Sequence, residues 1–97
     1  MNDIQKGVLT ANMVENLPTL RKKLGVSQEE LAGMIGVSRS TIAAIENKKR
    51  PLSWNMFLSL LLIFTKNDET DKLLSVLEIY TDELNSFSHG PPALLVV

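Results

Sequence analysis

Residues 20–53 read LRKKLGVSQEELAGMIGVSRSTIAAIENKKRPLS, and this stretch decides the fold. Ser27, with Glu30 three residues later, has the form of a capping box and predicts the start of a short helix that ends at Gly36. Ser38 predicts the cap of a second short helix directly after this turn. The apolar side chains that we expect to face inward are Leu31, Ala32 and Ile35 in the first helix and Ile42 and Ile45 in the second.

The outward face of the second short helix carries the functional signal. Two short helices separated by so tight a turn have the spacing of a helix-turn-helix, whose second helix presents its N-terminal residues to base edges in the major groove. Arg39, Ser40, Ala43 and Ala44 lie on the face opposite the inward isoleucines. Arg39 can donate two hydrogen bonds to guanine, whereas the alanines offer only methyl groups, so we expect modest direct readout and a larger share for DNA shape. The alternative for Arg39 is a solvated arginine at a helix start.

The charge of the chain is unevenly distributed. The formal net charge is −1, yet residues 16–53 contain seven basic and three acidic residues, and residues 54–97 contain two basic and six acidic residues. A basic half beside an acidic half indicates that one part of the molecule meets a polyanion. The alternative is an ordinary solvated surface with uneven charge.

Composition excludes several classes of protein. With 44% hydrophobic and 22% charged residues, the chain is typical of a globular domain. It has no cysteine and one histidine, His89, so we expect no metal site and no cofactor, and no nucleophile–base pair indicates an enzyme. No apolar run reaches the length of a membrane helix, and the N-terminus lacks the pattern of a signal peptide, so we expect a cytoplasmic protein.

Helix signals continue on both sides of residues 20–53, and no stretch alternates as a half-buried strand would. On the N-terminal side, Asn12 and Glu15 form a capping pair, and Pro18 predicts either a kink or a helix that starts at Asn16. The helices expected on the C-terminal side run from a cap at Ser53 through Phe64, and from a cap at Asp68 or Thr70 to about Phe87. The predicted fold class is therefore all-α, a compact bundle of about five helices.

Several residues of this stretch stand in one register: Gln28, Leu31-Ala32, Gly36-Val37-Ser38, Ile42, Ile45-Glu46 and the basic run after Asn47. In this register the chain resembles the helix-turn-helix domain of the phage repressor and Cro family, in its widespread bacterial transcription-regulator branch of the xenobiotic-response-element type. The resemblance runs from Leu20 to about Phe64, nearly half of the chain. It implies a lambda-repressor-like bundle that binds operator DNA as a dimer.

The resemblance also implies roles for single residues. The positions that match base-reading positions are Arg39, Ser40, Ala43 and Ala44. The positions that match DNA-backbone-binding positions are Arg21, Gln28, Ser38, Asn47, Lys49 and Arg50. Gln28 matches a glutamine that also braces the recognition helix. Glu46 lies near the basic run, and we interpret it as a member of a structural ion pair; the run itself also suits the C-terminal end of a helix.

The C-terminal third predicts an assembly surface. A helix over residues 56–64 is apolar on nearly every side and has to be buried on every side. Beyond it, apolar residues from Leu73 to Phe87 follow one another at intervals of 4, 3, 4 and 3, which is a short heptad seam. We expect a homodimer whose interface comprises Phe57, Leu61, Phe64, Leu73, Leu77, Tyr80 and Leu84. The alternative is that the seam covers the domain's own core.

These features predict four parts: an N-terminal segment (1–11), a Cro/C1-type helix-turn-helix domain (12–66), a C-terminal dimerisation helix (67–87) and a tail (88–97). The predicted function is that of a bacterial or phage transcriptional regulator. We expect it to bind double-stranded DNA sequence-specifically and to repress, as a homodimer on a palindromic operator. The alternative is an antitoxin-type interaction module that binds a partner protein through residues 68–87 and autoregulates its operon.

Overall fold

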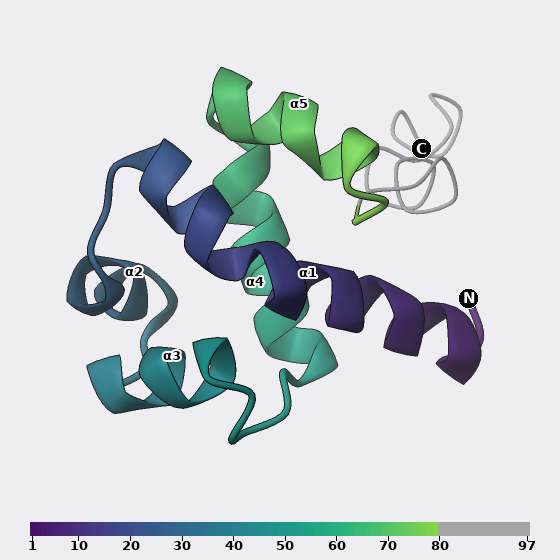
Figure 1. Cartoon of the computed structure of the whole chain (residues 1–97), viewed down its shortest axis with the longest axis horizontal. Helices are drawn as coiled ribbons and strands as arrows, with labels where there is room; N and C mark the ends of the chain where they lie inside the picture. The colour runs from purple at the N-terminus through teal and green to yellow at the C-terminus, as the bar shows by residue number, and fades with distance from the viewer. Residues whose placement is uncertain (80–97) are drawn as a thin grey trace, which may run out of the picture.

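The computed structural model describes residues 1–79, which form five α-helices and no strand. The helices are α1 (Asp3–Leu24), α2 (Gln28–Ile35), α3 (Arg39–Glu46), α4 (Trp54–Thr65) and α5 (Asp68–Val76). Figure 1 shows α2 and α3 together at one end of the molecule, with α4 crossing the long α1 and α5 packed beside them. The all-α class and the five helices are confirmed.

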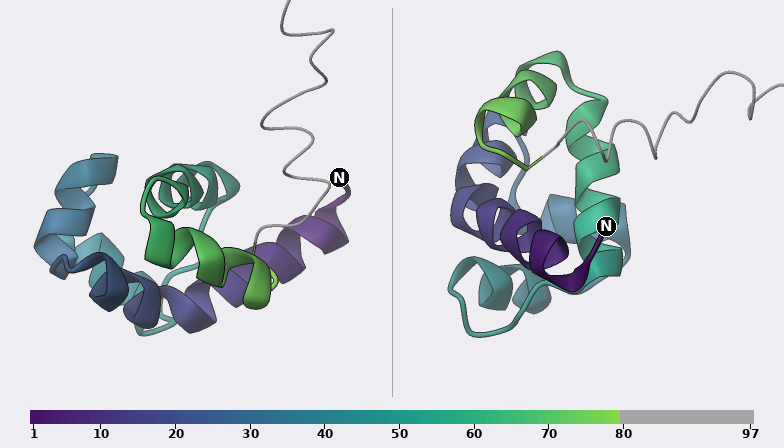
Figure 2. Two further views of the ribbon diagram at one scale, coloured as in Figure 1. Left: turned by 90° about the horizontal axis from the view of Figure 1, so that it is seen from above. Right: turned by 90° about the vertical axis from the view of Figure 1, so that its right-hand side faces the viewer.

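Helix α1 begins earlier than the sequence indicated. Asn2 caps it in a capping box: its Oδ1 accepts a hydrogen bond from the Gln5 amide at 2.8 Å, and Gln5 Oε1 accepts one from the Asn2 amide at 2.9 Å. The expected start at Asn12 or Asn16 was therefore wrong, and residues 3–11 are the first turns of α1. Pro18 lies inside this helix, which follows a curved course in Figure 2.

Tertiary packing explains why α1 continues through its proline. Proline removes one backbone hydrogen bond from a helix interior and crowds the preceding turn. The face that α1 presents to the core has four buried side chains, Leu9, Met13, Leu17 and Leu20. Burying a leucine or methionine side chain contributes about 1.5–3 kcal/mol relative to leaving it exposed. Four such side chains along one helix outweigh the cost of a single proline.

Helix α5 ends earlier than the sequence indicated. Its cap is Asn67 rather than Asp68 or Thr70, and it ends at Val76 because Glu78 takes a left-handed conformation (φ +56°). The Ile79 amide then donates to the Leu74 carbonyl at 2.8 Å, which closes the helix end. The expected continuous helix from residue 67 to about residue 87 was therefore wrong at residues 77–79. Tyr80, Leu84, Phe87 and the tail 88–97 with His89 lie outside the described residues.

The core explains why α4 is apolar on nearly every side. Phe57, Leu61 and Phe64, expected at a dimer interface, are buried in the chain's own core, with exposed fractions of 0%, 5% and 0%. The reason is that α1 is longer than expected, and both α1 and α5 pack against α4. Leu73 and Leu77 are half-buried and pack at the edge of the same core. The alternative that this region covers its own core holds for the described side chains.

Candidate nucleic-acid interface

Helices α2 and α3 form the tight helix pair that the sequence predicted. Ser27 caps α2 in a capping box with Glu30, and Gly36 ends α2 in a left-handed conformation (φ +76°) that glycine adopts without steric cost. Ser38 caps α3. The expected inward side chains Leu31, Ala32, Ile42 and Ile45 are buried, and Ile35 is half-buried.

The first turn of α3 presents polar groups to solvent. Ser38, Arg39 and Ser40 are exposed. Ser38 Oγ accepts from the Thr41 amide at 3.2 Å and lies 2.9 Å from both Ser40 Oγ and Thr41 Oγ1. The first turn of a helix carries partial positive charge and amides without an intrahelical partner, so this turn suits an anion.

Ala43 and Ala44 lie less far outward than expected. Both are half-buried rather than fully on the exposed face of α3. The Ala44 carbonyl accepts from the amides of Lys49 and Arg50 at 2.8 and 3.3 Å, so the chain folds back over this end of the helix. The exposed face of α3 is therefore widest at its N-terminal turn.

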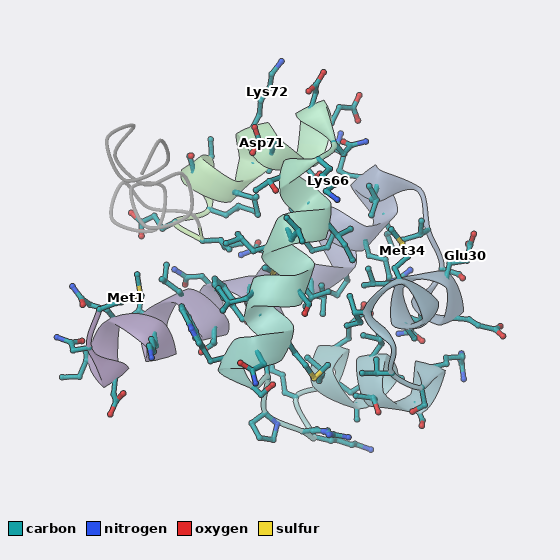
Figure 3. The ribbon with its side chains drawn as sticks, turned by 180° about the vertical axis from the view of Figure 1, so that it is seen from behind. Met1, Glu30, Met34, Lys66, Asp71 and Lys72 are labelled. Atoms are coloured by element: carbon teal, nitrogen blue, oxygen red, sulfur yellow. The ribbon has the colours of Figure 1, made fainter. Side chains whose placement is uncertain are left out.

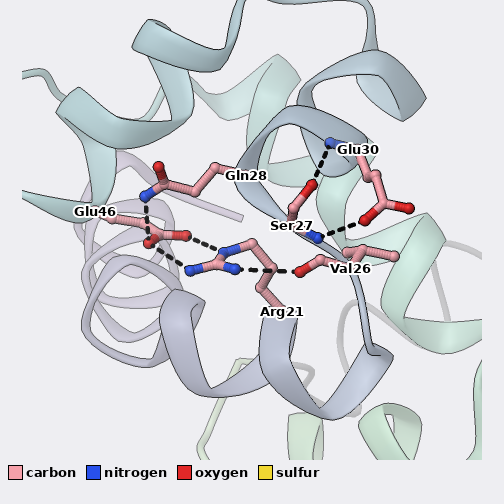
Figure 4. Close-up of polar contacts among 6 residues, drawn as sticks. All are labelled: Arg21, Val26, Ser27, Gln28, Glu30 and Glu46. Carbon is pink, nitrogen blue, oxygen red and sulfur yellow. Dashed lines mark hydrogen bonds and ion pairs between the residues drawn. The ribbon is translucent and has the colours of Figure 1, made fainter.

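Arg21 joins three helices through one buried carboxylate (Figure 4). Its Nε donates to Glu46 Oε2 at 2.8 Å, its Nη2 to Glu46 Oε1 at 3.2 Å and its Nη1 to the Val26 carbonyl at 3.1 Å. Gln28 Nε2 donates to the same Glu46 Oε1 at 3.0 Å. The side chains of Arg21 and Glu46 are 14% and 6% exposed. We call Arg21, Gln28 and Glu46 the buried polar cluster.

The buried polar cluster engages Arg21, which was expected to bind the DNA backbone. All three nitrogens of its guanidinium donate hydrogen bonds within the chain, to Glu46 and to the Val26 carbonyl. The hydrogen bond to Glu46 raises the pKa of Arg21 above its ordinary value; burial opposes this rise, and the negative charge of Glu46 adds to it. Glu46 is in a structural ion pair, as expected, but its partner is Arg21 and not the basic run. Gln28 braces α3 through Glu46.

The loop after α3 holds the basic run. Asn47 ends α3, and Lys48 follows in a left-handed conformation (φ +61°). Lys48 Nζ pairs with Glu15 Oε2 of α1 at 2.6 Å, and this hydrogen bond, together with the positive charge, lowers the pKa of Glu15. Lys49 and Arg50 are exposed, and among residues 1–79 neither they nor Arg39 form an ion pair.

An open cleft lies beside this loop. It has a volume of about 560 Å³ and is lined by Thr10, Ala11, Val14 and Glu15 of α1 and by residues 48–52. Glu15 and Lys48 meet across it. The exposed lysine and arginine side chains therefore stand at the rim of a surface depression next to α3.

Other kinds of site find no support in the part of the chain that is described. No group of three or more His, Asp or Glu side chains within residues 1–79 could hold a metal ion. No helix in that range is both long and apolar enough to cross a membrane.

The main element that the sequence analysis missed is the pairing of Arg21 with Glu46. The two residues are 25 positions apart, and nothing local in either segment joins them. The only available signal was an acidic residue, Glu46, directly before the basic run; it indicated an ion pair but did not identify Arg21 as the partner.

Comparison with known protein families gives a match that covers the helix pair. The helix-turn-helix family model matches residues 19–60, which comprise the last six residues of α1, all of α2 and α3, and the first seven residues of α4. No curated protein and no solved structure gives a match to the chain. The chain thus carries a helix-turn-helix domain. Such domains bind DNA in transcription regulators and are not an enzyme family, so the match supports a DNA-binding transcription regulator.

Proposed function

We propose that this protein is a sequence-specific regulator that binds double-stranded DNA and represses transcription as a homodimer on a palindromic operator. One observation carries the proposal: the N-terminal turn of α3 is exposed and electropositive, and its helix is fixed to α1 and α2 by the buried polar cluster. Because α3 is held through Glu46 at its C-terminal end, its exposed N-terminal turn can enter a major groove without loss of the helix's own order.

Base reading is assigned to the exposed turn of α3. Arg39 donates its guanidinium to O6 and N7 of a guanine, a contact that discriminates by about 1–3 kcal/mol. Ser40 contacts either a donor or an acceptor, and Ala43 and Ala44 meet thymine methyl groups at the inner part of the face. Because two of these four positions are half-buried alanines, much of the selectivity comes from DNA shape.

Backbone binding is assigned to the groups that surround this turn. Ser38, Asn47, Lys49 and Arg50 are exposed on either side of α3 and reach phosphates. Gln28 binds Glu46 through its Nε2, and its amide group stands at the first turn of α2, next to the DNA-facing side. Arg21 has a different role here: it positions α3 through Glu46 and does not touch DNA.

A homodimer has the two-fold symmetry that matches a palindromic operator. Two recognition helices on successive turns of a duplex are separated by about 34 Å. The exposed large apolar side chains of α4 and α5 are Leu62 and Val76, at 59% and 76% exposure, and a second copy can bury them. Leu73 and Leu77 of the expected interface are half-buried in the single chain. The antitoxin-type alternative gains no support from the helix-turn-helix match.

Selection of binding sites from a random DNA pool tests the proposal. We expect a palindromic consensus and, for Arg39→Ala, relaxed preference at one guanine position together with a loss of about 1–3 kcal/mol on the selected site. Lys72→Ala is the matched control because it removes an equal charge from α5, away from α3 in Figure 3. Failure to enrich any sequence, or an equal loss on every sequence for Arg39→Ala, would contradict base reading by α3.

A further inference from the structure

The N-terminal half of α1 has two unlike faces. One face is anchored, because Leu9 and Met13 are buried and Lys6 Nζ lies 5.3 Å from the centre of the Trp54 ring. On the other face Ile4 and Val8 are 79% and 53% exposed. Of the six large hydrophobic side chains that are exposed within residues 1–79, three lie in the first eight residues.

The exposed face is continuous and closely approachable. Ile4, Val8 and Ala11 follow one another at intervals of four and three residues, so they stack on one side of the helix. Gly7 lies beside them, and a methyl group placed on it would meet no atom within 4 Å. We call Ile4, Gly7, Val8 and Ala11 the apolar face of α1. A concentrated exposed apolar surface marks an interaction site.

The described chain ends beside this face. Ile79 is fully buried, and the Glu78 carbonyl accepts a hydrogen bond from Asn12 Nδ2 of α1 at 3.1 Å. Asn12 is one helical turn from Val8, a rise of about 6 Å. The described chain therefore ends, at residue 79, within one helical turn of the apolar face of α1.

The residues that come next have the composition to cover the face. Tyr80, Leu84 and Phe87 follow at the same intervals of four and three residues as the side chains of the apolar face. Between Asn12 and Ile4 the helix rises about 12 Å. The seven steps from residue 80 to residue 87 span about 11 Å as a helix and up to about 25 Å when extended, so the segment reaches the whole face in either conformation.

We propose that residues 80–87 of the same chain occupy the apolar face of α1, with Tyr80 over Ala11, Leu84 over Val8 and Phe87 over Ile4. A segment tethered one turn away has an effective concentration in the millimolar range, far above that of a second copy in solution. The proposal goes beyond the DNA-binding function. It assigns Tyr80 and Leu84 to the chain's own α1 and removes them from the dimer interface that the sequence predicted.

Disulfide trapping tests the proposal because the chain contains no cysteine. The full chain is made with Val8→Cys and Leu84→Cys and oxidised at low micromolar concentration. We expect an intramolecular disulfide, seen as a monomer with faster mobility on a non-reducing gel. The matched control is Met34→Cys with Leu84→Cys: Met34 is also 53% exposed and lies on α2, far from Met1 in Figure 3. The Val8 pair should close at least ~10-fold faster than the Met34 pair.

Each other outcome overturns the proposal. Equal rates for the two pairs mean that residue 84 does not favour α1. A covalent dimer of the single Val8→Cys variant that forms faster than the Met34→Cys dimer means that a second copy occupies the face. A measurement without cysteines is hydrogen exchange of the full chain carrying Tyr80→Ser, Leu84→Ser and Phe87→Ser. Amides of residues 5–11 should exchange faster than in the parent while those of α3 do not change, and unchanged exchange in residues 5–11 rejects the contact.

Discussion

Two ion pairs tie the C-terminal end of α3 to α1, and they differ in their burial. Glu46 binds Arg21 with side chains 6% and 14% exposed, whereas Lys48, two residues later, binds Glu15 with side chains 62% and 67% exposed. Both distances are short, at 2.8 and 2.6 Å. Distance alone would rank the pairs as equal. Burial makes the first a fixed joint between helices and leaves the second open to exchange with solvent ions and phosphate.

The largest expected effect comes from breaking the buried pair. Glu46→Ala leaves the Arg21 guanidinium and the Gln28 amide without their acceptor, and we expect a loss of about 3 kcal/mol in the free energy of unfolding, measured with urea. Glu29→Ala, which removes an exposed carboxylate from α2, is the control and should cost less than ~1 kcal/mol.

A double variant separates two effects of Glu46→Ala: the loss of the ion pair itself and the cost of leaving the Arg21 charge unpaired. Replacing both partners with methionine removes the charge that would be left unpaired, so Arg21→Met with Glu46→Met should recover part of the stability lost in Glu46→Ala. Equal stability of Glu46→Ala and the parent chain would contradict the distinction between the two ion pairs.

The separation along the chain between interacting residues explains how much of the fold could be predicted from the sequence. The starts of α2 and α3 depend on Ser27, Glu30 and Ser38, whose hydrogen bonds reach only three residues along the chain. Both partners of such a hydrogen bond lie within a few residues of each other, so the sequence alone shows the whole motif. The helix pair, its buried isoleucines and its exposed Arg39 were therefore predictable.

The role of Asn12 and the end of α5 depend on contacts between distant residues, whereas the start of α1, which was also missed, is set by a local capping box of Asn2 and Gln5. Asn12 looked like a helix cap with Glu15, but its side chain instead donates to the Glu78 carbonyl, 66 residues away. The heptad spacing through Leu73 and Leu77 suggested a long helix, but Ile79 turns back into the core. The partner of Glu46 was hidden for the same reason. The periodicity of a sequence does not show which distant segments will contact each other in the folded chain.

A second prediction separates two contributions of Lys48 to stability: its contact with Glu15 and its left-handed backbone conformation. Lys48→Ala removes the contact with Glu15 but keeps a residue with a Cβ at φ +61°. Lys48→Gly removes both the contact and the steric cost of that conformation, so Lys48→Gly should be more stable than Lys48→Ala by about 1 kcal/mol, measured by urea unfolding. Lys49→Gly with Lys49→Ala, one residue later, provides the control pair. Equal stability of the two Lys48 variants would show that the left-handed conformation costs nothing.

A third prediction concerns DNA binding by the exposed pair. Glu15 holds Lys48 at the rim of the cleft, so Glu15→Gln frees one cation next to α3. We expect tighter binding to non-specific duplex at low salt and a dependence of log K on log salt that is steeper by about 0.9, the value for one added phosphate contact. Lys49→Ala should change the slope by a similar amount in the opposite direction. A slope that Glu15→Gln leaves unchanged means that Lys48 already contacts phosphate in the parent protein.

The smallest expected effect is the pH dependence of the exposed pair. The hydrogen bond and charge of Lys48 hold the pKa of Glu15 below its ordinary value of 4.5 in the folded chain. A carboxyl group with a lowered pKa stabilises the folded state at pH values above its unfolded pKa, and this stabilisation is lost as the pH falls through the folded pKa. The melting temperature of the parent should therefore exceed that of Glu15→Gln near pH 7, and the difference should shrink below about pH 4.5. Glu30, whose pKa is lowered by the Ser27 amide and hydroxyl, titrates in both proteins and cancels in this comparison. A difference that persists at pH 2 would assign the effect of Glu15→Gln to something other than its charge, and the contrast between the two ion pairs would then lose its electrostatic basis.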